Sequence, residues 1–196
     1  MFKFLSSAII RILGWKIEGQ YPHHEKKLVI IVFHHTSNWD FPMGILLRNS
    51  VGFKANFVMK GNMFKPPFGF IFRWMGGYPV ERDPKKKKFN LTDSIVNLYN
   101  ENENFTITFT PEGTRSKVRT LKTGSWLIAK KANVPILYIE FDFGKKIFRL
   151  SETHYACPTF KEEYEMMKDY FSDSTGLIKE LSFNFEDNDM QFRNTE

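Results

Sequence analysis

Two short apolar runs of this chain each end in a cluster of polar, reactive side chains, and this pattern constrains the fold more than any other feature. Residues 28–33 (LVIIVF) lead into 34–40 (HHTSNWD), and residues 105–110 (FTITFT) lead into 110–116 (TPEGTRS). The continuous apolar run 28–33 is typical of a buried strand, and 105–110 is a further strand candidate. In open α/β sheets, ligand sites gather at the carboxyl ends of the strands. The shared position therefore favours a functional role for both clusters.

Strand and helix patterns alternate along the rest of the chain. Short apolar runs predict further strands over 55–60, 136–143 and 146–150. Apolar residues at helical spacing predict helices over 41–48, 67–75, 91–100 and 123–132, and a final helix from 161 to about 181. This alternation predicts a single α/β domain with a layered sheet.

The N-terminal residues 2–15 form an apolar segment that only Lys3 and Arg11 interrupt. Its longest uncharged stretch, 4–10, has seven residues, far fewer than the ~20 that a membrane span needs. No small-x-small cleavage site follows it, which disfavours a signal peptide. One face of the expected helix is apolar. Two interpretations stay open, an in-plane membrane anchor and a helix packed on the core.

The charge of the chain is unevenly distributed. The net charge of +6 comes from 28 Lys and Arg against 22 Asp and Glu. Residues 1–149 carry 24 basic and 11 acidic side chains (+13), whereas 150–196 carry 4 and 11 (−7). The basic part permits nucleic acid, lipid headgroups or phosphorylated substrates as partners. The lone Cys157 excludes an internal disulfide and fits a reducing compartment.

His35 and Asp40 form the pattern HxxxxD in the predicted strand-to-helix turn. An imidazole that acts as a general base needs a carboxylate to fix its tautomer and stabilise the imidazolium. A tight turn would bring these two side chains together. The alternative is that Asp40 only caps the following helix, which has Pro42 in its first turn.

Two weaker hypotheses use the same residues. Ser37 with His35 and Asp40 would make a crowded catalytic triad, since nucleophile and base normally come from separate segments. A metal site built on His34, His35 and Asp40 has only the distant His154 as a further candidate ligand.

The second cluster suits an anionic ligand. Gly113 permits a turn with close backbone approach, and Arg115 offers a bidentate fork that matches a phosphate. Thr114 and Ser116 add hydroxyl groups. The alternative is an ordinary turn.

A third segment, 76–82 (GGYPVER), is followed by four lysines at 85–88. The two glycines predict a hairpin-like bend that brings Arg82 inward. The lysine run is more typical of a solvated loop than of a ligand site.

These residues resemble a known family in their order and spacing. The segments 35–40 (HTSNWD), 76–82 (GGYPVER), 110–116 (TPEGTRS) and 134–136 (VPI) are similar to four ordered blocks of the PlsC-like lysophospholipid/1-acylglycerol-3-phosphate acyltransferases. The resemblance spans roughly residues 28–140 and suggests a compact bacterial member. One departure is His34, where family members often carry Asn.

The resemblance implies a role for each matching residue. His35 would be the general base that deprotonates an acceptor hydroxyl, and Asp40 would orient it. Arg82, Glu112, Gly113, Thr114 and Arg115 would bind the anionic headgroup of the acceptor. No metal and no cofactor are expected, because the acyl thioester is a co-substrate.

The resemblance also implies the fold and the partners. The fold would be glycerol-3-phosphate acyltransferase-like, with a mixed sheet flanked by helices. We expect a membrane-associated amphipathic helix over 1–18, the acyltransferase domain over 19–160, and an acidic C-terminal helix and tail over 161–196. The partners would be a lysolipid acceptor, acyl-CoA or acyl carrier protein, and an anionic membrane surface, at the cytoplasmic face.

Two alternatives to acyl transfer stay open. A lipid thioesterase or hydrolase would use the same His–Asp pair to activate water. A non-catalytic basic protein would bind membrane or nucleic acid, for which the interleaved Phe and Lys around 53–72 offer a stacking surface. With the motifs in place, we expect lipid and not nucleic acid as the partner.

Overall fold

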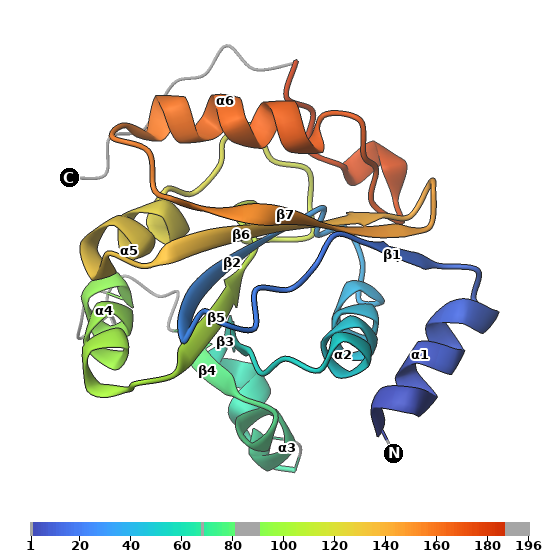
Figure 1. The fold of residues 1–196 in the computed structure, drawn as a ribbon, viewed down its shortest axis with the longest axis horizontal. Coiled ribbons are helices and arrows are strands. Elements are labelled where there is room, and N and C mark those ends of the chain that lie inside the picture. The colour runs from blue at the N-terminus through green and yellow to red at the C-terminus, as the bar shows by residue number, and fades with distance from the viewer. Residues whose placement is uncertain (1, 68, 81–90, 187–196) are drawn as a thin grey trace.

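A mixed sheet of seven strands organises the computed structural model, which describes residues 2–67, 69–80 and 91–186 (Figure 1). Its strand order is β1-β7-β6-β2-β5-β3-β4. Neighbouring strands run parallel except β6 and β7, which are antiparallel. The strands are β1 (Lys16–Glu18), β2 (Lys27–Phe33), β3 (Asn56–Lys60), β4 (Gly77–Val80), β5 (Phe105–Phe109), β6 (Pro135–Asp142) and β7 (Ile147–Tyr155). The predicted α/β class with a layered, mixed sheet is confirmed.

Helices cover both faces of this sheet. One face carries α1 (Phe2–Ile12), α2 (Asp40–Val51) and α3 (Gly69–Trp74), and the other carries α4 (Leu91–Glu101), α5 (Gly124–Ala132) and α6 (Phe160–Phe171) (Figure 1). Two 3₁₀ turns complete the order, η1 (Gly61–Phe64) and η2 (Lys179–Leu181). Because both faces of a parallel sheet are covered, its central strands must be apolar on both sides.

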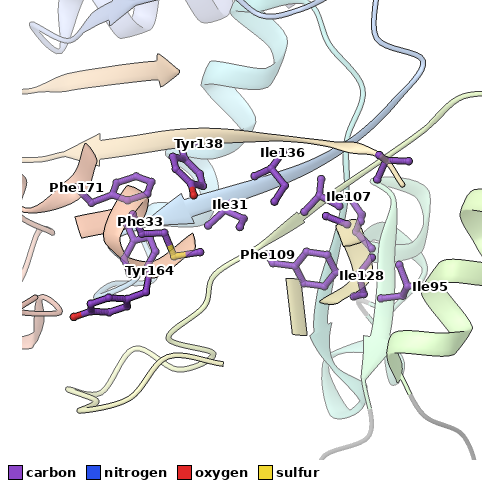
Figure 2. Close-up of a cluster of buried hydrophobic side chains, with 14 of the residues drawn as sticks. Ile31, Phe33, Ile95, Ile107, Phe109, Ile128, Ile136, Tyr138, Tyr164 and Phe171 are labelled. Atoms are coloured by element: carbon purple, nitrogen blue, oxygen red, sulfur yellow. The ribbon is translucent and has the colours of Figure 1, made fainter. Parts of the chain in front are cut away.

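The central strand β2 shows this requirement residue by residue. Val29, Ile31 and Phe33 belong to the buried cluster under α4, α5 and α6, part of which Figure 2 shows. The intervening Leu28, Ile30 and Val32 belong to the buried cluster under α1 and α2. The run 28–33 is therefore continuous in sequence but divided between two cores by the strand's period of two.

The sheet order places the two polar clusters beside each other. Strands β2 and β5 are parallel neighbours, with Ile31 opposite Phe109. The carboxyl end of β2 therefore opens into 34–40 next to the point where β5 opens into 110–116.

The chain differs from the sequence-based expectation near Gly76. The residues after it form an edge strand parallel to β3, reached through η1 and α3, so the predicted hairpin-like bend is wrong. Gly76 has a φ of +94°, and a Cβ there would lie 2.8 Å from Asn56 Oδ1. This glycine is thus needed for a close approach at the start of β4. Arg82 and the lysines 85–88 lie outside the described residues.

The last predicted helix is also shorter than expected, because α6 ends at Phe171 instead of near residue 181. The following residues, 172–176 (SDSTG), favour turns over helix. The chain then turns back and buries Phe183 and Phe185 in the same cluster as α6. Strand β1 was not predicted, since its three residues are all exposed.

None of the helices formed by the described residues combines the length and the apolar character that crossing a membrane requires.

Candidate active site

The turn 34–40, called the catalytic turn below, folds around the carboxylate of Asp40. Nδ1 of His35 lies 3.0 Å from Asp40 Oδ2. The same oxygen accepts the backbone N–H groups of Thr36 and Ser37, each at 2.9 Å. Asp40 is only 6% exposed. Although it begins α2, its carboxylate bonds backward into the turn and caps no helix N–H. The capping hypothesis is therefore wrong, and the predicted His–Asp pair is present.

This arrangement fixes the tautomer of His35. A carboxylate oxygen only accepts hydrogen bonds, so Nδ1 carries the proton and donates it to Asp40. The lone pair of His35 is then on Nε2. The side chain of His35 is 28% exposed, so solvent or a substrate can reach the ring. The geometry is that of a general base oriented by a carboxylate.

Glu112 supports the catalytic turn from the neighbouring strand. The backbone N–H of His35 donates to both oxygens of its carboxylate, at 3.2 and 3.0 Å. Glu112 is 3% exposed, and this burial raises its pKa to about 8, despite the hydrogen bond from His35. The structure thus places Glu112 beneath His35. Its predicted contact with an acceptor headgroup stays a prediction.

Arg115 extends from the second cluster across to the first. Its Nη1 donates to Oδ1 of Asn38 in the catalytic turn, and both side chains are exposed. Thr114 lies between Arg115 and Gly113, and its hydroxyl accepts the N–H of Ser116 at 3.4 Å. The guanidinium is therefore held at the same edge of the sheet as His35, where it is accessible to an anion.

Lys122 is a further cation at this edge that sequence reasoning did not assign to the site. Gly113 has a φ of +64°, and a Cβ there would lie 2.3 Å from Lys122 Nζ. The ammonium thus packs directly against the glycine backbone, and the positive φ of Gly113 disfavours other residues at that position. The signal in the sequence was the Lys-Thr-Gly stretch 122–124, which follows the second cluster at short range.

His34, the other histidine of the turn, has no exposed edge and is 1% accessible. Its Nδ1 accepts the N–H of Phe183 at 3.3 Å, so its proton is on Nε2, which donates to Ser174 Oγ at 3.1 Å. Burial lowers the pKa of His34 to about 4. Its Nδ1 lies 3.8 Å from Glu112 Oε1, but burial disfavours the charged form of both groups, so this contact is not an ion pair near neutral pH.

The two weaker hypotheses gain no support from the geometry. Ser37 Oγ accepts the N–H of Trp39 at 3.2 Å, and within the described residues it makes no hydrogen bond to His35. His154 lies on β7 and pairs with Glu163 at 3.0 Å. In the described parts of the chain, no three His, Cys, Asp or Glu side chains group as metal ligands would.

The depressed pKa of His34 predicts a measurable pH dependence of stability. In the unfolded chain His34 takes up a proton near its ordinary pKa of 6.5, whereas in the folded protein it does so only near pH 4. The unfolded state therefore binds more protons in this window, and the free energy of unfolding falls as the pH falls through it. At about 1.4 kcal/mol per pH unit, the loss approaches roughly 3 kcal/mol.

Replacing His34 with Gln keeps a hydrogen-bonding side chain but removes this titration. We expect urea unfolding of His34→Gln to vary less between pH 7 and pH 4 than that of the wild type. His24→Gln is the matched control, because His24 is exposed. An unchanged slope in His34→Gln would contradict the neutral, buried state of this imidazole.

Comparison with known proteins identifies the family of this chain. A family model described as Acyltransferase matches residues 15–140. A 1-acyl-sn-glycerol-3-phosphate acyltransferase of Haemophilus influenzae is 30% identical over an alignment of 132 residues, which covers 64% of this chain and 53% of that protein. This chain thus spans about half the length of that curated relative.

A solved structure shows the same fold. The 1-acyl-sn-glycerophosphate (LPA) acyltransferase PlsC of Thermotoga maritima matches with a TM-score of 0.60 and 17% identity, over 86% of this chain and 74% of that chain. The family match covers more than half of the sequence and includes both polar clusters. The chain therefore belongs to the Acyltransferase family.

Proposed function

We propose that this protein moves a fatty acyl group from an acyl thioester to the free hydroxyl of a lysolipid. The observation that carries the proposal is the His35–Asp40 pair, whose free Nε2 lies at the same sheet edge as the Arg115 guanidinium. The acceptor would be 1-acylglycerol-3-phosphate, as the name of the Haemophilus relative suggests, or a related lysophospholipid or lyso-aminolipid. The donor would be acyl-CoA or acyl carrier protein.

The proposed reaction uses His35 as a proton carrier. Its Nε2 removes the proton of the acceptor hydroxyl while that oxygen attacks the thioester carbonyl carbon. Asp40 stabilises the imidazolium that forms. The tetrahedral intermediate then expels the thiolate, which takes up the proton from His35. General-base catalysis of this kind contributes about 10²–10⁴ in rate, and no cofactor is needed because the thioester already carries the activated acyl group.

Arg115 is the proposed ligand of the acceptor's anionic headgroup. A guanidinium offers two parallel N–H groups to a phosphate, and the contact with Asn38 holds it at the catalytic turn. We propose that Thr114 and the backbone at Gly113 also bind the headgroup. Glu112 would contribute to headgroup binding by supporting this edge of the sheet. Arg82 stays a proposed headgroup ligand from the family resemblance alone.

The proposed substrate lies in a bilayer, and one side of the protein suits such a surface. Phe4 on α1 and Trp74 on α3 are 83% and 86% exposed, and Phe2, Ile12 and Phe70 are also exposed. Helices α1, α2 and α3 lie on the side of the sheet opposite α6 (Figure 1). Residues 1–17 and 41–80 contain no Asp or Glu but several Lys and Arg. We therefore propose that this apolar and basic surface binds an anionic membrane, at its cytoplasmic face, where the thioester donors occur.

Loss of the His35 imidazole tests the reaction. With purified protein, labelled acyl-CoA and lysophosphatidate, we expect His35→Ala to lower kcat by about 10²–10⁴. Asp40→Asn should also lower kcat, because the amide no longer stabilises the imidazolium. The control is His24→Ala, which changes an exposed histidine. Retained transfer in His35→Ala would contradict the mechanism, and free fatty acid formed without lysolipid would show a hydrolase instead.

Loss of the Arg115 guanidinium tests headgroup binding. We expect Arg115→Ala to raise the KM for lysophosphatidate about tenfold or more, since a charge-assisted bidentate contact is worth at least 1.4 kcal/mol. The KM for the acyl donor should stay close to the wild-type value. Arg119→Ala is the matched control, because Arg119 is exposed just beyond the second cluster. An equal rise of both KM values would contradict a headgroup-specific role.

Vesicle binding tests the membrane surface. We expect the double variant Phe70→Ser/Trp74→Ser to weaken binding to phosphatidylglycerol vesicles, measured by sedimentation, about a hundredfold or more, because each buried aromatic side chain contributes roughly 1.5–3 kcal/mol and 1.4 kcal/mol is about tenfold in affinity. The control is Tyr155→Ser, an exposed aromatic on β7. Wild-type binding of the double variant, or equal binding to neutral phosphatidylcholine vesicles, would contradict the proposed surface.

A further inference from the structure

One distant segment contacts the catalytic turn on both sides of His35. This C-terminal segment, residues 172–186, follows α6 and lies about 140 positions beyond the turn in sequence. It reaches His34 through Ser174 and Phe183, and it reaches Thr36 through Ile178. The two residues that flank His35 in sequence, His34 and Thr36, are thus both held by the C-terminal segment.

The contact with His34 is a chain of hydrogen bonds in which each group donates to the next. The N–H of Phe183 donates to Nδ1 of His34, and Nε2 of His34 donates to the hydroxyl of Ser174. That hydroxyl donates in turn to the carbonyl of Phe171 at 2.8 Å, at the end of α6. Both ring nitrogens of His34 are engaged in this buried chain, so the ring is held in one orientation.

The contact with Thr36 leads directly to the catalytic carboxylate. The N–H of Ile178 donates to Thr36 Oγ1 at 3.2 Å, and the backbone N–H of Thr36 donates to Asp40. Gly176 packs so closely on this threonine that a Cβ would lie 2.5 Å from Oγ1 and 2.6 Å from Cγ2. Any side chain at position 176 would therefore push against Thr36.

The C-terminal segment is itself rigidly anchored. Phe183 and Phe185 are buried, and both rings contact Phe33, the last residue of β2. The N–H of Gly176 donates to Ser182 Oγ at 2.9 Å, which closes the segment on itself. The support behind the catalytic turn is therefore continuous with the core under α6.

We propose that the C-terminal segment positions His35 and Asp40 for proton transfer, with Ser174 and Gly176 as its positioning residues. The inference rests on the proposed function, because it assigns His35 the proton-carrying role. Displacing a reacting group by about 1 Å can lower a rate about a hundredfold. A segment that fixes both neighbours of the base therefore governs turnover without touching a substrate.

A positioning role differs from ordinary core packing in what it changes. Packing alone would lower stability and leave the rate of the folded enzyme unchanged. Positioning lowers kcat while the KM values stay near those of the wild type, since the proposed headgroup ligand Arg115 belongs to the segment after β5 and not to residues 34–36, which the C-terminal segment holds. It also alters the environment of the His35 Nδ1 proton, which NMR detects without any substrate.

The experiment compares Ser174→Ala and Gly176→Ala with Tyr99→Phe and His35→Ala. Tyr99→Phe is the matched control, because its buried hydroxyl donates to Leu28 at the opposite end of β2. For each variant, kcat, both KM values and urea unfolding are measured, and the His35 Nδ1–H resonance is measured in the wild type and in every variant that keeps His35. We expect Ser174→Ala and Gly176→Ala to lower kcat about tenfold or more and to shift the resonance, whereas Tyr99→Phe, at comparable loss of stability, keeps kcat within about twofold.

The outcomes separate this inference from the proposed function. If His35→Ala is inactive while Ser174→Ala and Gly176→Ala keep wild-type kcat and resonance, the positioning role is overturned and the function stands. If His35→Ala keeps its transfer activity, the proton-carrying role of His35 and the positioning role both fail, although acyl transfer itself stands. If the wild type transfers no acyl group to lysolipid, the proposed function fails, and a shifted His35 resonance in Ser174→Ala still supports the structural coupling. Should Gly176→Ala not fold, Ser174→Ala alone decides, because it removes only a hydroxyl.

Discussion

The carboxylate of Asp40 is the interaction on which the rest of the site depends. A buried charge needs donors to replace water, and Oδ2 of Asp40 receives three, from the His35 ring and from the backbone of Thr36 and Ser37. To supply them, the chain must fold back on itself directly after β2. The same bonds to Oδ2 therefore set the tautomer of His35, its orientation and the start of α2. The hydrogen bonds to Asp40 thus account both for the fold of this turn and for the orientation of the imidazole.

The sheet order then determines what stands next to this turn. Because β5 is the parallel neighbour of β2, the chain beyond β5 delivers Glu112 beneath His35 and Arg115 beside Asn38. Neither residue is near His35 in sequence. A polar cluster after one strand would be an ordinary turn, but two clusters after adjacent parallel strands bring the imidazole of His35 and the guanidinium of Arg115 to one sheet edge. The alternating pattern of strands and helices is what makes that combination possible.

The sequence predicted what local spacing controls. The His35–Asp40 pair, the buried strand ending at Phe33 and most of the helices follow from patterns within a few residues, and they are confirmed with shifts of a few positions at their ends. The burial of His34 was not predictable, since its partners Ser174 and Phe183 are brought there only by tertiary folding. The edge strand β4 and the end of α6 were missed for a related reason. Strand pairing by β4 and burial of Phe183 and Phe185 are long-range effects that local propensity does not contain.

The fold places acidic side chains and acid-free segments of the chain on opposite sides of the sheet. The acidic side chains of α6, among them Glu162, Glu165 and Asp169, are exposed on one side of the sheet. The acid-free segments 1–17 and 41–80 form α1, α2 and α3 on the opposite side (Figure 1). An anionic surface attracts one side of such a molecule and repels the other, so it exerts a torque as well as a net force. On the proposed membrane, the net charge of +6 therefore matters less than its separation, which turns α6 toward water and the exposed aromatic residues of α1 and α3 toward lipid.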